Sequence, residues 1–535
     1  MNSRNSADRG IRWTFVRPAA PGRSWSGWRG FASTRGPVYG AALIIALLCL
    51  LPIGFIVTIA LQAGWDAASA LLLRPRVGHL LLNTLLLELC TLPAALTLAL
   101  AFAWLTERTT LPAARLLSWL AIAPLAVPAF VHSYGWITLV PSMNGLPAAV
   151  LVSVLAYTPF VYLPVAAQLR RLDPALEDAA ASLGLDPLAI FCRVILPQLR
   201  LGLCAGGMLV ALHLLAEYGL FALIRFETLT TAIMDQFQSA HSAPLANLLG
   251  GVLVLACLAL MAIESLIRGA GRYARLGPGA ARRAPRRDLG PLTVPALVFF
   301  LSWAVLSLAV PGGTILRWLA AGGWSVWTPS LALAFTQTVL LSLAGALLTT
   351  AAAAPIAWLS VRAPGRLQRL LETCHSYVGS LPGVVVGLAL VTVTVSVALP
   401  LYQTMLTLLL AYMLLFLPRA LAGLRPSLAQ APIELECAAM ALGRTHWQAF
   451  FVITLRIAAP GAAASLALVG LGASTELTAT LMLAPNGVNT LATGFWSLTN
   501  EIDYAAAAPY AAMMILASLP LTIILRNQSM RVSGR

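Results

Sequence analysis

About twelve long apolar runs restrict this chain to one kind of architecture. Each run is close to the ~20 residues that an α-helix needs to cross ~30 Å of hydrocarbon. A segment inside a bilayer must satisfy its own backbone hydrogen bonds, so helices are expected in every run. We therefore predict an all-α membrane protein. The runs lie at 39–62, 80–105, 116–139, 146–168, 199–223, 245–267, 291–311, 331–359, 376–399, 402–422, 460–482 and 506–525.

One segment of the chain is written twice. Residues from Asn83 onward match residues from Gln337 onward at an offset of 254. Five extra residues then enter the second copy, and the offset becomes 259. The first offset pairs Thr84 with Thr338, Trp104 with Trp358, Arg108 with Arg362, Pro128 with Pro382 and Pro164 with Pro418. The second pairs Glu177 with Glu436, Gly184 with Gly443, Phe191 with Phe450, Glu217 with Glu476 and Thr231 with Thr490.

The repeat predicts two homologous six-helix halves. Each half has a leading helix and a repeated five-helix core, and an even number of helices precedes each copy of the same loop. The halves should therefore be related by an axis along the membrane normal, with a transport path at their seam. The predicted parts are an Arg-rich tail at 1–38, a first half at 39–267 (core about 80–267), a basic linker at 268–290 and a second half at 291–535 (core about 331–525).

The basic charge follows the expected topology. The chain has a net charge of +15 and no lysine, so all 34 basic residues are arginines. With the N-terminus inside, 30 of them fall in inner segments, which is the positive-inside bias of multi-pass proteins. We expect a bacterial inner-membrane protein with both termini in the cytoplasm and no nucleic-acid partner. The four arginines left outside are Arg74, Arg76, Arg225 and Arg317.

A polar segment between the fourth and fifth runs predicts a short helix, a turn at Gly184 and a second helix. Glu177 and Asp178 lie in the first turns, where acidic residues stabilise a helix N-terminus. Leu183 and Leu188 can form an apolar edge. An amphipathic helix pair of this kind suits docking into a groove of another protein.

This segment resembles the EAA loop of ABC importer permeases. In the first half the matching residues are Asp178, Ala179 and Ala180, then Gly184, Val194, Leu196 and Pro197. In the second they are Cys437, Ala438 and Ala439, then Gly443, Ile453, Leu455 and Arg456, with Glu436 supplying an acid one residue earlier. The resemblance implies a type I importer-like fold. It also implies that both loops are coupling helices that fit clefts on two copies of an ATPase subunit, which drives alternating access.

The nucleotide chemistry is expected on a separate subunit. A P-loop uses the lysine of GxxxxGK[ST] to reach the β- and γ-phosphates, and this chain has no lysine. We therefore expect no cofactor in this chain, with ATP and Mg²⁺ on the partner ATPase. HExxH and GxSxG motifs are also missing, so a membrane enzyme is not favoured. A secondary transporter driven by an ion gradient is the alternative from a different class.

A narrower resemblance is to fused two-domain iron(III) permeases, which receive ferric ion from a periplasmic binding protein. It rests on the stretches 214–219 (LLAEYG), 474–483 (STELTATLML) and 489–493 (NTLAT). Thiamine, polyamines and other small solutes remain alternatives within the same importer class. The outer loops at 224–243 and 483–504 are expected to receive the binding protein.

Glu217, Tyr218 and Glu476 are the candidate path residues. Fe³⁺ prefers carboxylate and phenolate oxygens. Glu217 lies 20 residues past Pro197, or about 30 Å along a helix, which predicts a place near the outer mouth. Three interpretations stay open: transient contact with the cation, hydrogen bonds to a docked binding protein, and helix capping or an ion pair with Arg225.

Overall fold

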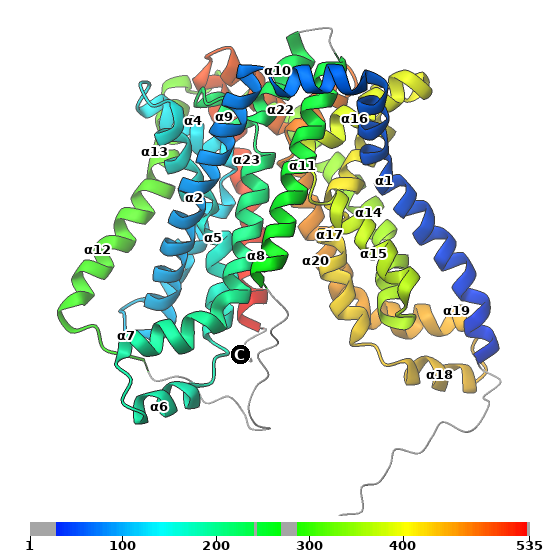
Figure 1. Ribbon diagram of the computed structural model, residues 1–535, viewed down its shortest axis with the longest axis horizontal. Coiled ribbons are helices and arrows are strands. Elements are labelled where there is room, and N and C mark those ends of the chain that lie inside the picture. The colour runs from blue at the N-terminus through cyan, green and yellow to red at the C-terminus, as the bar shows by residue number, and fades with distance from the viewer. Residues whose placement is uncertain (1–27, 240–242, 269–285, 532–535) are drawn as a thin grey trace, which may run out of the picture.

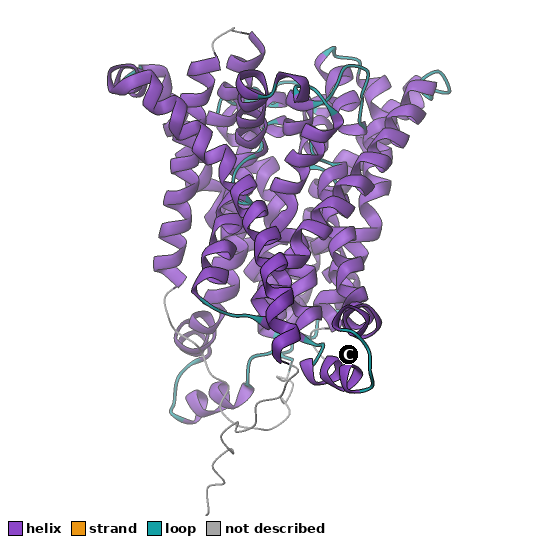
Figure 2. Ribbon diagram, turned by 90° about the vertical axis from the view of Figure 1, so that its right-hand side faces the viewer, coloured by secondary structure: helices purple, strands orange, loops and turns teal. Residues whose placement is uncertain are grey.

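The computed structural model describes residues 28–239, 243–268 and 286–531. Most of the predicted tail and linker lie outside the described residues. The described chain folds into helices joined by loops; it contains no strand, only one isolated β-bridge between Thr109 and Arg287. The long helices run roughly along one direction, and short helices and loops gather at the two ends of the bundle (Figure 2).

The first half contains α1 (Trp28–Leu72), α2 (Pro75–Arg108), α3 (Ala114–Ile122), η1 (Ala123–Ala126), α4 (Ala129–Leu139), α5 (Gly145–Leu169), α6 (Pro174–Ser182), α7 (Pro187–Ile190), η2 (Phe191–Ile195), α8 (Leu196–Ala216), α9 (Gly219–Leu223), α10 (Leu229–Ser239) and α11 (Ala243–Arg268).

The second half contains η3 (Gly290–Leu292), α12 (Thr293–Ala304), η4 (Val305–Ala309), α13 (Val310–Gly322), α14 (Pro329–Arg362), α15 (Arg366–Val378), α16 (Gly383–Val397), η5 (Leu399–Leu401), α17 (Met405–Ala429), α18 (Ile433–Ala441), α19 (His446–Ala449), η6 (Phe450–Thr454), α20 (Leu455–Ser474), α21 (Thr478–Leu483), α22 (Leu491–Asn500) and α23 (Tyr504–Arg531).

The helices confirm the all-α membrane fold. Within the described residues, nine helical segments are long and apolar enough to span a bilayer. A tenth candidate is the pair formed by Ala114–Ala126 and Ala129–Leu139, which is bent by 92°. Two shorter apolar helices, Gly383–Val397 and Tyr504–Pro520, complete the set. These segments match the twelve predicted runs one for one.

Equivalent prolines break the third span of each half. Pro128 precedes α4 and Pro382 precedes α16, each as the residue just before the helix. Proline has no backbone N–H to donate, so it fits a helix start and interrupts a continuing helix. The pairing of Pro128 with Pro382 in the sequence thus reports a shared break in the fold.

Each core is completed by the leading helix of the other half. Helix α1 packs against α14, α15 and α16, whereas α12 lies beside α2 and α3 on the far side of the molecule (Figure 1). Phe102 of α2 stacks on Phe299 with ring centroids 4.9 Å apart and contacts Trp303 at 5.0 Å. The two halves are therefore interlocked rather than merely adjacent.

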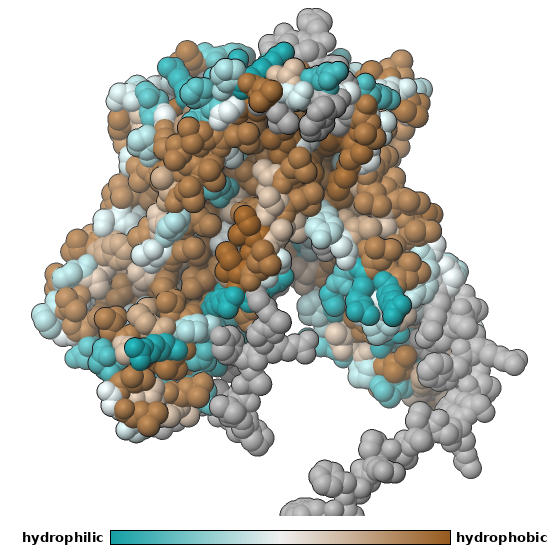
Figure 3. All heavy atoms as spheres, in the orientation of Figure 1, coloured by the Kyte–Doolittle hydropathy of each residue, from teal (hydrophilic) through white to brown (hydrophobic). Residues whose placement is uncertain are grey.

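Aromatic and polar contacts join the halves at the α10/α22 end. Tyr134 donates a hydrogen bond to the carbonyl of Tyr504 at 2.6 Å. The rings of Phe130 and Phe495 lie 5.5 Å apart. At the opposite end, which carries α6 and α18, the two halves are separated by an open notch (Figure 3). On the face shown in Figure 3, a broad hydrophobic band lies between the two ends, as expected for a protein surrounded by lipid.

Candidate functional site

Both coupling-type loops lie at the same end of the bundle. Helix α6 projects below one half and α18 below the other (Figure 1). Each is followed by a short helix and a π-helical turn, η2 or η6, before the long helix α8 or α20 begins. The two π-turns, Phe191–Ile195 and Phe450–Thr454, fall at equivalent positions, so the whole helix–turn–helix unit is repeated.

A left-handed glycine forms the turn in each loop. Gly184 has a φ of +82° and Gly443 a φ of +86°. A side chain in this region costs about 1–2 kcal/mol, although a Cβ would meet no atom within 4 Å at either glycine. The preceding residue is a highly exposed leucine in both loops: Leu183 is 83% exposed and Leu442 is 86% exposed. Each loop thus presents an apolar tip outside the bundle.

The acid preceding each EAA-type motif turns inward. Glu177 forms an ion pair with Arg108 at 2.9 Å, and Glu436 forms one with Arg362 at 2.7 Å. All four side chains are largely buried, and Glu436 is fully buried. Glu436 therefore cannot replace the missing exposed acid at Cys437, as the sequence had suggested. The first loop carries an exposed Asp178 at that place, and the second an exposed cysteine.

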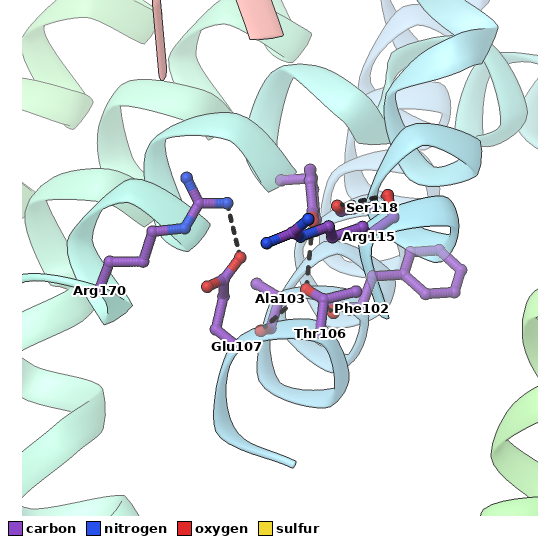
Figure 4. A network of polar contacts seen from close by, with 8 residues as sticks. Phe102, Ala103, Thr106, Glu107, Arg115, Ser118 and Arg170 are labelled. Carbon is purple, nitrogen blue, oxygen red and sulfur yellow. Dashed lines mark hydrogen bonds and ion pairs between the residues drawn. The ribbon is translucent and has the colours of Figure 1, made fainter. Parts of the chain in front are cut away.

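Further polar contacts differ between the loops. In the first half, Arg170 pairs with Glu107 at 2.6 Å, so a second ion pair joins the end of α2 to the end of α5 (Figure 4). The positions that match Glu107 and Arg170 in the second half are Val361 and Ala429. There Thr454 instead donates a hydrogen bond to Glu436. The repeated element is thus the Arg–Glu pair. The first half adds a second ion pair beside it, and the second half adds a hydrogen bond from a threonine.

The remaining motif residues lie around these contacts. Ala179 and Ala438 are exposed, Ala439 is half-buried, and Ala180 is buried against the loop. Pro197 lies in the first turn of α8, and the exposed Leu455 begins α20.

A cavity of about 400 Å³ lies between the two halves. Its walls come from the end of α8 and the start of α9, from their counterparts α20 and α21, and from α5, α16 and α17. Glu217, Tyr218 and Glu476, the three path residues predicted from the sequence, all line it. The structure therefore brings together two acids that are 259 residues apart in the chain.

The two acids cap equivalent short helices. Glu217 accepts a hydrogen bond from the backbone N–H of Leu220 at 2.9 Å, and Glu476 accepts one from that of Ala479 at 3.0 Å. Of the contacts left open by the sequence, helix capping is therefore present, and the partner of Glu217 is not Arg225. The second oxygen of Glu217 accepts from the hydroxyl of Tyr157 at 2.7 Å. Glu476 makes no such side-chain bond within the described residues.

Sequence reasoning missed two basic side chains in this cavity. Arg419 was counted with the inner arginines, but it lies in the body of α17 and lines the cavity, its Cζ 5.0 Å from the ring centroid of Phe416. His213 of α8 also faces the cavity. Helices α5 and α17 match at the offset of 259, because Gly202 faces Gln168 and Pro164 where Gly461 faces Ser427 and Gly423. Pro418 therefore matches Pro159, and its pairing with Pro164 was wrong. At this offset Arg419 and His213 match Phe160 and Gly472, so the cavity departs from two-fold symmetry. The available signal was the location of Arg419 inside the run 402–422.

The cavity does not resemble a resident metal centre. Among the described residues, no group of three or more His, Cys, Asp or Glu side chains could hold a metal ion together.

Hydrogen bonds in the outer loops change the alignment of the two copies at one place. The backbone N–H of Leu229 donates a hydrogen bond to Thr84 Oγ1 at 3.4 Å, and that of Leu491 donates one to Thr338 Oγ1 at 2.7 Å. Because Thr84 matches Thr338, Leu229 must match Leu491, at an offset of 262. The pairing of Thr231 with Thr490 was therefore wrong. Thr228 matches Thr490, and Thr231 matches Thr493. Three more residues enter the second copy between α21 and α22.

Fold and site together define a duplicated multi-pass membrane protein with two equivalent loops at one end and a cavity between its halves. The family model for the binding-protein-dependent transport system inner membrane component matches residues 70–270 and again 347–534. The chain belongs to this family. It is the permease component of a binding-protein-dependent ABC transport system, a multi-pass inner-membrane subunit of a family of transport permeases rather than enzymes.

Individual relatives carry different solutes. An Fe(3+)-transport system permease protein of Haemophilus influenzae is 34% identical over 90% of this chain and 97% of its own length. A sulfate transport system permease protein of Escherichia coli is 27% identical over 42% of this chain and 82% of its own. A spermidine/putrescine transport system permease protein of Escherichia coli is 29% identical over 28% of this chain and 61% of its own.

Proposed function

We propose that this chain forms the complete membrane path of an ATP-driven importer for ferric iron. The single observation that carries the cargo assignment is the similarity to the iron permease, which extends over nearly all of both chains. The sulfate and polyamine permeases match less than half of this chain. Because one polypeptide supplies both halves, no second permease subunit is needed.

Each coupling loop receives one ATPase subunit. Leu183 and Leu442 are the most exposed large apolar residues of the two loops and lie beside their turn glycines. Such exposed apolar side chains, at the polar end of the bundle, mark surfaces that another protein covers. Two equivalent loops at one end support two ATPase copies per chain. The absence of lysine from the sequence supports locating ATP and Mg²⁺ on those subunits.

The α6/α18 end faces the cytoplasm. The arginines of the segments 108–115, 170–200 and 362–369 gather at this end, and the positive-inside bias assigns such an end to the cytoplasmic side. The loops around α10 and α22, at the opposite end, then face the periplasm and receive the binding protein. In this orientation the notch opens toward the cytoplasm, so the structure resembles an inward-open state.

Ferric ion passes between Glu217 and Glu476. Their carboxylates and the hydroxyl of Tyr157 are hard oxygen donors of the kind that Fe³⁺ prefers. Backbone N–H groups already occupy one oxygen of each acid, which limits how tightly either can hold the ion. Weak, transient contact suits a path that must release its solute.

Reconstitution tests this function. The chain would be purified with its ATPase, placed in proteoliposomes and supplied with the binding protein loaded with ⁵⁵Fe³⁺. We expect uptake that requires both ATP and the binding protein. Uptake without any ATPase would support the ion-gradient alternative and overturn the proposal. Parallel assays with labelled sulfate, spermidine and thiamine test the other solutes; uptake of one of these in place of iron would overturn the cargo assignment alone.

A further inference from the structure

Two matching helices extend from one end of the molecule to the other. Helix α2 runs from Pro75 to Arg108, and α14 from Pro329 to Arg362. Both have 34 residues, and both boundaries match at the offset of 254. At 1.5 Å per residue each helix is about 50 Å long, enough to cross the bilayer and reach both faces.

At the α6/α18 end, each long helix is bound to a coupling helix by one buried ion pair. The arginine is in the last turn of the long helix and the glutamate is in the first turn of the coupling helix, so both charges also suit the local helix dipoles. The backbone of α6 packs mainly against α7 and η2, and that of α18 against α19 and η6. The ion pairs Arg108 with Glu177 and Arg362 with Glu436 therefore connect the coupling helices to α2 and α14 directly.

At the other end, each long helix holds the first turn of an outer helix. Thr84 and Thr338 accept a hydrogen bond from the first residue of α10 and α22, respectively. The residue before each threonine adds a second contact: Asn83 donates to the carbonyl of Glu227 at 3.0 Å, and Gln337 accepts from the N–H of Asn489 at 2.8 Å. Threonine, arginine and glutamate recur in both copies, whereas Glu107 and Arg170 do not.

We propose that α2 and α14 are struts that mechanically connect the ATPase-facing helices α6 and α18 to the binding-protein-facing helices α10 and α22. Thr84, Thr338, Arg108 and Arg362 are positioning residues in this connection. The inference rests on the proposed function. Each strut contains one proline, Pro93 or Pro355, but remains one continuous helix between its two attachments. Docking of the binding protein at one end therefore reorients the ATPase sites at the other. Breaking either attachment separates the two events.

The outer attachment is tested with the double variant Thr84→Val and Thr338→Val, which removes the acceptors while keeping the side-chain shape. The readout is ATPase activity of the reconstituted complex with and without loaded binding protein. We expect unchanged co-purification and unchanged basal hydrolysis, with stimulation by the binding protein reduced by at least about fivefold. The matched control is Thr97→Val with Thr336→Val, because these threonines bond only within α2 and α14. Full stimulation in the double variant would overturn the inference.

The inner attachment is tested by charge exchange. The variants Arg108→Gln and Arg362→Gln should lose stimulation, and the exchanges Arg108→Glu with Glu177→Arg and Arg362→Glu with Glu436→Arg should restore part of it. Stimulation that survives in the glutamine variants, or a loss that neither exchange relieves, would overturn the strut. Failure of the unmodified chain to co-purify with any ATPase would instead overturn the proposed function, so the two failures are distinguishable.

Discussion

The two coupling loops share a backbone but differ in their exposed chemistry. Both have the same left-handed glycine, the same exposed leucine before it and the same buried Arg–Glu pair. The first loop exposes Asp178 where the second exposes Cys437. The difference shows which parts of the loop its own fold requires and which parts are left for recognition. The inward-facing contacts recur in both halves, and the outward-facing acid does not.

The largest expected effect on ATPase docking comes from the shared turn. Gly184→Arg and Gly443→Arg each place a side chain at a φ that favours glycine and add bulk and charge beside the apolar tip. We expect each to weaken ATPase binding at its own loop by at least about tenfold, equivalent to 1.4 kcal/mol, while insertion is retained. Gly290→Arg, which alters another positive-φ glycine outside the loops, is the control. Undiminished co-purification after both changes would contradict the docking role.

Loss of the buried ion pair should destabilise the protein more in the second half than in the first. Removing one partner of a buried ion pair costs about 3–5 kcal/mol, because the other charge is left without compensation. Glu436→Ala should therefore lower the thermal unfolding midpoint more than Glu177→Ala, since Glu177 retains partial exposure and Glu436 has none. Thermal unfolding of the detergent-purified chain measures this. Equal shifts would show that the difference in burial has no energetic consequence.

The two cavity acids, Glu217 and Glu476, allow the halves to be compared at the proposed substrate path. Glu217 accepts a hydrogen bond from the Tyr157 hydroxyl as well as from a backbone N–H, whereas Glu476 accepts from backbone N–H groups alone. We expect Glu476→Gln to reduce iron uptake several-fold, by about 1 kcal/mol of lost interaction, and Glu217→Gln to reduce it less. Initial uptake rates in proteoliposomes decide the order. A larger loss from Glu217→Gln would assign the main cation contact to the first half.

The smallest effect is expected from the outward-facing position itself. Asp178→Asn removes an exposed charge whose contribution to docking should be about 0.2–1 kcal/mol, so ATPase affinity should fall about twofold to fivefold. Cys437→Ala should change it less. Raised salt should weaken docking of the unmodified first loop more than that of the second. Equal effects of the two substitutions would show that recognition does not depend on the acid.

Much of this fold could be predicted from the sequence because each segment that crosses lipid must be a long apolar helix. Twelve apolar runs gave twelve helical segments, and Pro128 and Pro382 marked the broken spans. The crossing of α1 and α12 onto the opposite cores could not be predicted, because nearly uniform apolar helices carry little information about their partners. The direction of Glu436 depends on Arg362, which is distant in sequence. Arg419 was misplaced because an arginine within one helical run was assigned to the adjacent loop.

Of the candidate site, sequence symmetry located the residues but not their contacts. It placed Glu217 with Glu476 and Gly184 with Gly443, since each pair keeps its offset. It did not show that the two acids line one cavity or that they cap short helices. It also failed across the loop between α21 and α22, where three added residues shift the offset to 262 and hydrogen bonds rather than residue identity reveal the matching threonines.

The number of ATPase subunits held by one chain tests the central claim most directly. Native mass spectrometry of the purified complex should give two ATPase copies per chain, and one copy when either Gly184→Arg or Gly443→Arg is present. A single ATPase in the unmodified complex, or two copies that survive both substitutions together, would contradict an account in which two repeated loops each hold one motor subunit.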